Sequence, residues 1–191
     1  MASELSYYRR QEHYRIVAID DVPKNKVPSD FTSAGWVESS GFFGSVINDL
    51  FDPKLRAAFD WQGWEDIRGK RAYVFSYRVP LANSRSSSSR CTGFTAFTNC
   101  RNVKYAYHGL LYVDAESLDI QRLTHVPDGL PAGYTAGAES VDYGRVTVAG
   151  TEYLLPISDR QETAGGKTLF RNDSSYGSYR KFVAESSLKA P

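Results

Sequence analysis

The residues that could perform acid–base or nucleophilic chemistry are few and scattered along this sequence. The three histidines, His13, His108 and His125, share no i, i+4 or two-apart spacing, so we expect surface or ordinary hydrogen-bonded histidines rather than a metal site. No Gly-x-Ser-x-Gly nucleophile elbow is present. A triad built from distant residues stays open, with His108 or His125 as its best histidine. The sequence predicts no catalytic residue, no metal and no cofactor.

Aromatic side chains form the clearest pattern with chemical meaning. Aromatic residues make up 14% of the chain, with 13 Tyr and 10 Phe. Seven of them fall on alternating positions of three predicted strands: Phe59, Trp61, Tyr73, Phe75, Tyr77, Tyr105 and Tyr107. Packing in a core accounts for most of them, and a concave wall for an acyl chain or another apolar ligand is the functional alternative. Trp61 and Trp64 are the expected exposed pair, which could also stack on sugar rings.

The two cysteines bear on the compartment of the protein. Cys91 and Cys100 are separated by eight residues in a Ser- and Thr-rich run. This spacing can close a loop as a disulfide, which needs an oxidising compartment. Two unrelated thiols are the alternative. The polar run Asn83 to Arg90 includes four consecutive serines and is expected to be a mobile loop, which Cys91 to Cys100 extends into a pinned hairpin or lobe.

One helix is predicted among many strands. Its apolar stripe comprises Phe42, Phe43, Val46, Ile47, Leu50 and Phe51. Ser39 or Ser40 can cap its start, and Asp52-Pro53 marks its end. Because Gly41 and Gly44 weaken its first turn, this helix should depend on packing against a sheet.

The predicted strands are short and regularly spaced. They are His13 to Ile19, Leu55 to Gln62, Ala72 to Val79, Val103 to Tyr107, Leu110 to Val113, Ile120 to His125, Ser140 to Val148, Thr151 to Ile157, Thr168 to Asn172 and Tyr179 to Ser186. Consecutive strands with short turns and one helix predict a mainly β, α+β protein, in which a curved antiparallel sheet wraps over a helix.

Composition sets the outer limits. A chain of 191 residues with 41% hydrophobic residues is expected to form one domain, residues 1–191. The net charge of +1 shows no basic excess, so nucleic acid is not an expected partner. No stretch approaches the roughly 18 to 20 apolar residues of a membrane span. No signal segment follows Met1 either, so the protein is cytosolic or its sequence begins after such a segment.

Several segments resemble a group of uncharacterised acidobacterial secreted proteins, which are similar to the outer-membrane lipoprotein-sorting superfamily of carriers and receptors. The segments are Phe51-Asp52-Pro53, Phe59 to Glu65, Ile67 to Phe75, Tyr77-Arg78-Val79, Val141-Asp142-Tyr143, Tyr153 to Pro156 and Tyr179 to Ser187. The resemblance implies a strongly curved antiparallel sheet that forms an incomplete barrel over one or a few helices, with a cavity for acyl chains. It also implies that part of the native N-terminus is absent, and it assigns no functional residue.

Three functions are therefore carried forward. The first is a periplasmic or extracellular binding protein for an apolar small molecule, such as a lipid or a lipoprotein acyl chain. The second is an envelope hydrolase acting on an ester, lactone or glycan. The third is an interaction module for an envelope protein, in which Ser86 to Cys100 is the docking loop.

Overall fold

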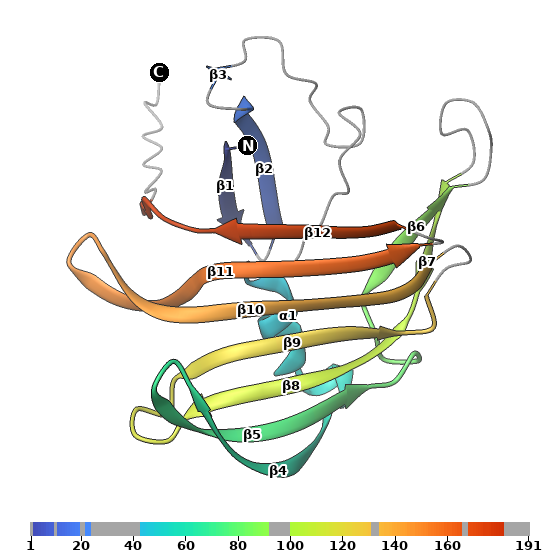
Figure 1. Ribbon diagram of the computed structural model, residues 1–191, viewed down its shortest axis with the longest axis horizontal. Helices are drawn as coiled ribbons and strands as arrows, with labels where there is room; N and C mark the ends of the chain where they lie inside the picture. Colours follow the sequence, from blue (N-terminus) through green and yellow to red (C-terminus); the bar gives the residue numbers. More distant parts are fainter. Residues whose placement is uncertain are drawn as a thin grey trace, which may run out of the picture.

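The computed structural model describes residues 2–9, 11–19, 22–23, 43–91, 100–130, 134–165 and 168–181, and these residues are mainly β (Figure 1). The main sheet has seven antiparallel strands: β4 (Ala58–Ile67), β5 (Lys70–Val79), β8 (Ala106–Asp114), β9 (Ile120–Asp128), β10 (Tyr134–Val148), β11 (Thr151–Gly165) and β12 (Thr168–Ser175). A second sheet contains β1 (Ala2–Tyr8), β2 (Gln11–Ile19) and β3 (Val22–Pro23), and a third contains β6 (Ser87–Cys91) and β7 (Cys100–Lys104).

The main sheet is a meander with one insertion. Its order is β12-β11-β10-β9-β8-β5-β4, so strands that follow one another in sequence lie side by side, except that β6 and β7 intervene between β5 and β8. The order is open, with β4 and β12 at opposite edges (Figure 1). The antiparallel, mainly β prediction is confirmed. The incomplete barrel stays a prediction.

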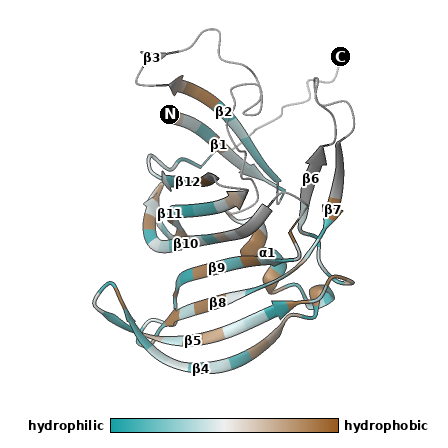
Figure 2. Ribbon diagram, turned by 45° about the vertical axis from the view of Figure 1, so that its right-hand side comes forward, coloured by the Kyte–Doolittle hydropathy of each residue, from teal (hydrophilic) through white to brown (hydrophobic). Residues whose placement is uncertain are grey.

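The core lies between one face of the main sheet and helix α1 (Ser45–Leu50), which has hydrophobic and hydrophilic stretches (Figure 2) and buries Val46 and Leu50. Its buried members are Val46, Leu50, Leu55, Tyr77, Val79, Tyr107, Leu111, Leu123, Val141 and Tyr143. A helix of six residues is too short to be stable alone, so packing must hold it. The prediction that this helix depends on a sheet is therefore consistent with its place.

Helix α1 begins later than predicted, and a side chain from another element binds its first N–H groups. Its N-cap is Gly44, and no side chain of its own caps it. Instead, Glu12 of β2 accepts hydrogen bonds from the backbone N–H groups of Gly44 (3.1 Å) and Ser45 (3.2 Å). A carboxylate is favourable there because the first N–H groups of a helix have no internal partner. The predicted caps Ser39 and Ser40, and also Phe42, lie outside the described residues.

The end of the helix also differs in detail from the prediction. Asp52 accepts a hydrogen bond from the Lys54 N–H and begins a 3₁₀ helix, η1 (Pro53–Leu55), so the predicted strand at Leu55 to Ala57 is wrong. The apolar alternation there was real, but the Asp-Pro start of a helical turn prevailed. The last predicted strand is also wrong at Tyr179 to Lys181, which are not in a strand. No helix among the described residues is long and apolar enough to span a bilayer.

Candidate functional site

An exposed group of aromatic side chains lies at the β4–β5 end of the main sheet. We call it the aromatic surface, and its members are Phe51, Phe59, Trp61, Trp64, Tyr73 and Phe75. The rings contact one another in two groups: Phe51 stacks on Phe59 (centroids 6.0 Å apart), and Trp61 contacts both Phe75 (5.4 Å) and Trp64 (5.6 Å). Trp64 also lies 4.3 Å from Tyr73. Phe59 and Trp61 are two residues apart on β4 and face the same side, so the two groups lie on one face of the sheet.

Strand register explains why these side chains share a face. Phe59 lies opposite Tyr77, and Trp61 lies opposite Phe75. Trp61 and Trp64 are three residues apart and would face opposite sides of a regular strand. The ladder shifts between Trp61 and Gly63, whose φ is +121°, and this bulge places Trp64 opposite Tyr73 on the same face. A glycine is needed here because other residues rarely adopt such a φ.

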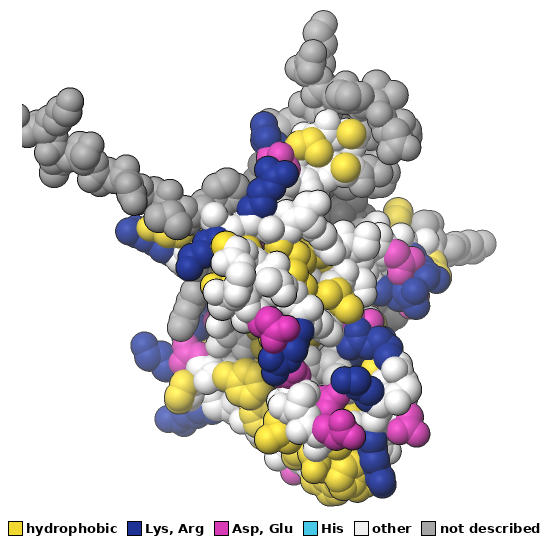
Figure 3. All heavy atoms as spheres, turned by 90° about the vertical axis from the view of Figure 1, so that its left-hand side faces the viewer, with side chains coloured by type: hydrophobic (Ala, Val, Ile, Leu, Met, Phe, Trp, Pro, Cys, Tyr) yellow, Lys and Arg dark blue, Asp and Glu magenta, His cyan; other side chains and the backbone are white. Residues whose placement is uncertain are grey.

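The aromatic surface is open to solvent. Its four most exposed side chains are Phe51 (54% exposed), Trp61 (50%), Trp64 (47%) and Phe59 (40%). Hydrophobic side chains accordingly gather at the lower end of the molecule, over β4 and β5 (Figure 3). The Arg71 guanidinium lies 4.5 Å from the centre of the Trp64 ring, as in cation–π contacts. Clustered exposed aromatics of this kind are typical of ligand or partner sites.

The remaining three residues of the predicted aromatic wall lie deeper. Tyr77 and Tyr107 are in the core, with 2% and 1% of their surface exposed, and Tyr105 is half-buried beside them. Burial raises the pKa of Tyr107 to about 12 and also raises the pKa of Tyr105. Phe59, Trp61, Tyr73 and Phe75 are thus the predicted residues that the structure brings together at the surface. Phe51 is an addition, which the sequence had placed on the buried stripe of the helix.

A depression of about 530 Å³ lies on the other face of the sheet, away from α1. Its lining includes Asp60, Ser76, Arg78, His108 and Thr124. Nδ1 of His108 lies 2.7 Å from a carboxylate oxygen of Asp128, which also pairs with Arg78 at 3.4 Å. A carboxylate that orients an imidazole is half of a hydrolytic triad.

Neither hydroxyl that lines the depression, Ser76 or Thr124, serves as the nucleophile of such a triad. The Ser76 hydroxyl is bonded to Gln62 and to the Asp60 carbonyl, and the Thr124 hydroxyl accepts from the Leu110 N–H. Neither hydroxyl contacts His108. The geometry of this depression therefore does not favour the hydrolase alternative.

The other two histidines lie in unlike settings. His125 is buried in the core beside Tyr107, with ring centroids 4.4 Å apart, and burial lowers its pKa to about 4. It is therefore neutral at neutral pH. His13 is exposed on β2. In the described part of the chain, no group of three His, Cys, Asp or Glu residues is placed to bind a metal ion.

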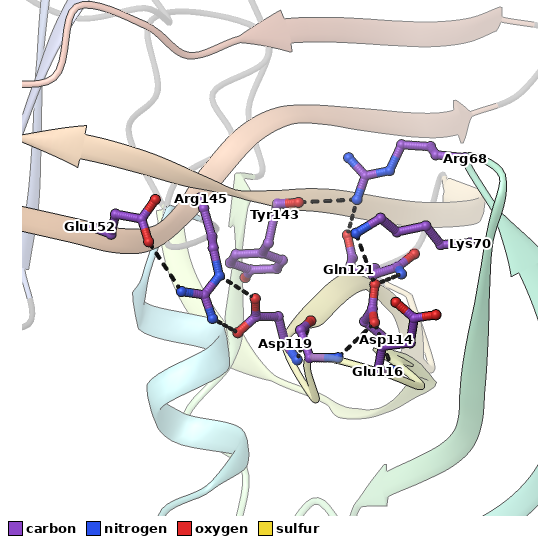
Figure 4. Close-up of polar contacts among 10 residues, drawn as sticks. Arg68, Lys70, Asp114, Glu116, Asp119, Gln121, Tyr143, Arg145 and Glu152 are labelled. Carbon is purple, nitrogen blue, oxygen red and sulfur yellow. Dashed lines mark hydrogen bonds and ion pairs between the residues drawn. The ribbon is translucent and has the colours of Figure 1, made fainter.

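A polar network fixes the turns at one end of the main sheet (Figure 4). The Arg68 guanidinium, from the β4–β5 turn, donates to the backbone carbonyls of Gln121 and Tyr143, both at 3.0 Å. Asp114 accepts from the N–H groups of Glu116 and Ser117, each at 2.9 Å. These contacts are internal to the fold, so we assign this network to structure and not to a ligand.

The cysteines are placed by backbone register. Cys91 of β6 lies directly opposite Cys100 of β7 in the third sheet. Directly opposed residues of an antiparallel pair have Cα atoms roughly 4.5 to 5.5 Å apart, within the range that a disulfide spans. The loop predicted up to Arg90 is wrong at Ser87 to Arg90, which belong to β6 and pair with β7. Residues 92–99 lie outside the described part, and the disulfide stays a prediction.

Comparisons with protein-family models, with curated proteins and with solved structures found no match to this chain. The argument for function therefore depends on the residues and their geometry.

Proposed function

We propose that the protein is a periplasmic or extracellular binding protein whose aromatic surface holds an apolar ligand, such as a lipid or a lipoprotein acyl chain. The observation that carries the proposal is the exposure of Phe51, Phe59, Trp61 and Trp64 in two ring groups on the same side of β4 and β5. Covering apolar surface yields about 25 cal/mol per Å² removed from water. An acyl chain laid across these rings would therefore bind with a favourable hydrophobic free energy.

The core suggests where such a ligand would lie. Tyr77, Tyr107 and Leu50 fill the space between α1 and the sheet and are almost fully buried. A ligand held on the outer rings needs no displacement of this packing. The resemblance to lipoprotein-sorting proteins, with its incomplete barrel and envelope location, supports the same ligand class. In this proposal, however, the ligand lies at the open β4–β5 end of the sheet, beside the core.

The test is a titration with palmitate below its micellar concentration, followed by isothermal calorimetry and native mass spectrometry. Saturable binding near one equivalent is expected. Trp61→Ala should weaken it at least about fivefold, because truncating a central aromatic contact commonly costs more than about 1 kcal/mol. Phe170→Ala is the matched control, since Phe170 is 44% exposed on the opposite edge strand β12.

Two results would count against the proposal. One is the absence of saturable binding of palmitate to a folded protein. The other is an equal loss of affinity in Trp61→Ala and Phe170→Ala, which would mean that the chain adheres to any exposed aromatic residue.

A further inference from the structure

The strand that carries most of the aromatic surface is also an edge of the main sheet. β4 has ten residues, and among the described strands only β5 pairs with it. Its outer backbone N–H and C=O groups therefore have no strand partner in the described part of the protein. An edge of this length is a template to which another extended chain can add.

The two faces of β4 differ in chemistry. Phe59, Trp61 and Trp64 lie on the face of the aromatic surface. Asp60 lies opposite Ser76 and Glu65 opposite Ala72, so both carboxylates lie on the other face. A strand that paired with β4 would meet aromatic rings on one side and carboxylates on the other, because successive side chains alternate.

The carboxylates on β4 differ from most acids elsewhere in the protein. Asp60, Glu65 and Asp66 are exposed, and none forms an ion pair with another described residue. By contrast, Asp119 and Asp142 are each held by an arginine at 2.6 Å. β4 therefore presents uncompensated negative charge along an open edge.

This charge selects among partners for the edge. A second copy of the chain that paired through β4 would place these carboxylates against the same carboxylates, which is unfavourable. The bulge at Gln62 further interrupts a long self-pairing. A strand with lysine or arginine at alternate positions would instead meet opposite charges.

We propose that β4 binds an extended peptide as an additional antiparallel or parallel strand, with apolar residues toward the aromatic surface and basic residues toward Asp60 and Glu65. Main-chain hydrogen bonds to the edge provide affinity, and the alternating side chains provide specificity. The regular parts of β4 on each side of the bulge provide the backbone groups with which the peptide pairs. The inference rests on the proposed function in one respect, because both use the aromatic surface for apolar contact.

The test uses capped eight-residue peptides. The first alternates valine and lysine, the second alternates valine and glutamate, and the third repeats the first with N-methylated backbone nitrogens on one edge. Binding is measured by calorimetry, and hydrogen exchange of the β4 amides is measured by NMR. The valine–lysine peptide should bind and should slow exchange in β4. The glutamate and N-methyl peptides should each bind at least about tenfold more weakly.

Variants of the carboxylates give a second readout. Asp60→Asn and Glu65→Gln should each weaken the valine–lysine peptide about two- to fivefold, as expected for exposed charge pairs, and more salt should shrink this difference. Glu116→Gln is the control, since Glu116 is an exposed acid in the β8–β9 turn, away from β4. Equal effects of all three substitutions would overturn the charge argument.

The outcomes separate this inference from the proposed function. Palmitate binding without binding of the valine–lysine peptide would overturn the strand-addition inference and leave the apolar-ligand proposal standing. Equal affinity for the N-methylated peptide would overturn strand addition in the same way. If neither palmitate nor any peptide binds a folded protein, both proposals fail.

Discussion

At the scale of single residues, Gly109 is the described glycine at which a side chain would meet the closest neighbours. β8 pairs with β9 at His108 and again at Leu111, but the two residues between them have no ladder partner on β9. The Tyr77 hydroxyl lies in this gap and donates to the Thr124 carbonyl at 2.6 Å. A Cβ on Gly109 would lie 1.9 Å from that carbonyl oxygen and 2.8 Å from the Tyr77 hydroxyl.

Gly109→Ala is therefore expected to destabilise the protein. One backbone atom and one buried ring must both move to make room, and overpacking of this kind costs about 1–3 kcal/mol or more. Urea unfolding followed by tryptophan fluorescence measures the loss. Gly177→Ala is the control, because a Cβ there meets nothing within 4 Å. A Gly109→Ala protein as stable as the Gly177→Ala protein would contradict the steric argument.

Strands β4 and β5 show what the positions of single residues in a sequence can and cannot predict. Alternation correctly placed Tyr73, Phe75 and Tyr77 on one face of β5. It could not tell which of them lies under α1, because depth depends on what the helix covers. Tyr77 is consequently buried, while Trp61 on the edge strand β4 is half exposed. The bulge that turns Trp64 to the same face had one signal, the glycine at 63.

At the scale of elements, the turn between β8 and β9 is organised around one carboxylate. Asp114 is 3% exposed, and it accepts from two backbone N–H groups of the turn, from Gln121 at 2.8 Å and from Lys70 at 3.4 Å. The hydrogen bonds from Ser117 and Glu116 hold the pKa of Asp114 far below its usual value of 3.8. Lys70 lies at the start of β5, so this carboxylate also joins two turns (Figure 4).

Asp114→Asn should lower the free energy of unfolding at neutral pH, and it should lower it less at acidic pH. Because the folded-state pKa lies below the unfolded one, Asp114 contributes stability above about pH 4, and this contribution disappears as the pH falls through the folded value. The difference in urea midpoint between the wild-type protein and Asp114→Asn should thus be large at pH 7 and smaller at pH 3. A difference that does not change with pH would show that shape, and not charge, holds the turn.

Elements were predictable where local and tertiary preferences agree. The predicted strands Ser140 to Val148 and Thr151 to Ile157 fall within β10 and β11, because turn residues at Ala149-Gly150 separate two alternating runs. The start of α1 was not predictable. Its first N–H groups are satisfied by Glu12, which is distant in sequence, and no local cap marks Gly44. The break predicted at His108-Gly109 is also absent, because Tyr77 and Thr124 fill the gap in a continuous β8.

At the scale of the whole molecule, the third sheet stands apart from the meander. β6 and β7 pair with each other and with no other described strand, and they interrupt the chain between the adjacent strands β5 and β8. A lone two-stranded hairpin is marginally stable in water. This insertion therefore needs a further constraint, and Cys91 lies opposite Cys100 where a cross-strand bond would supply it.

We expect the protein to carry a Cys91–Cys100 disulfide when it is produced in an oxidising compartment. The intact mass should be about 2 Da below that of the reduced chain, and denatured protein should show no free thiol. Closing so short a loop should contribute about 2–3 kcal/mol, which the double substitution to serine would remove from the hairpin. Two titratable thiols in protein secreted to the periplasm would contradict the pairing. The proposal of an envelope location would then lose the support of a disulfide, while the proposal for the aromatic surface, which lies on other strands, would be unaffected.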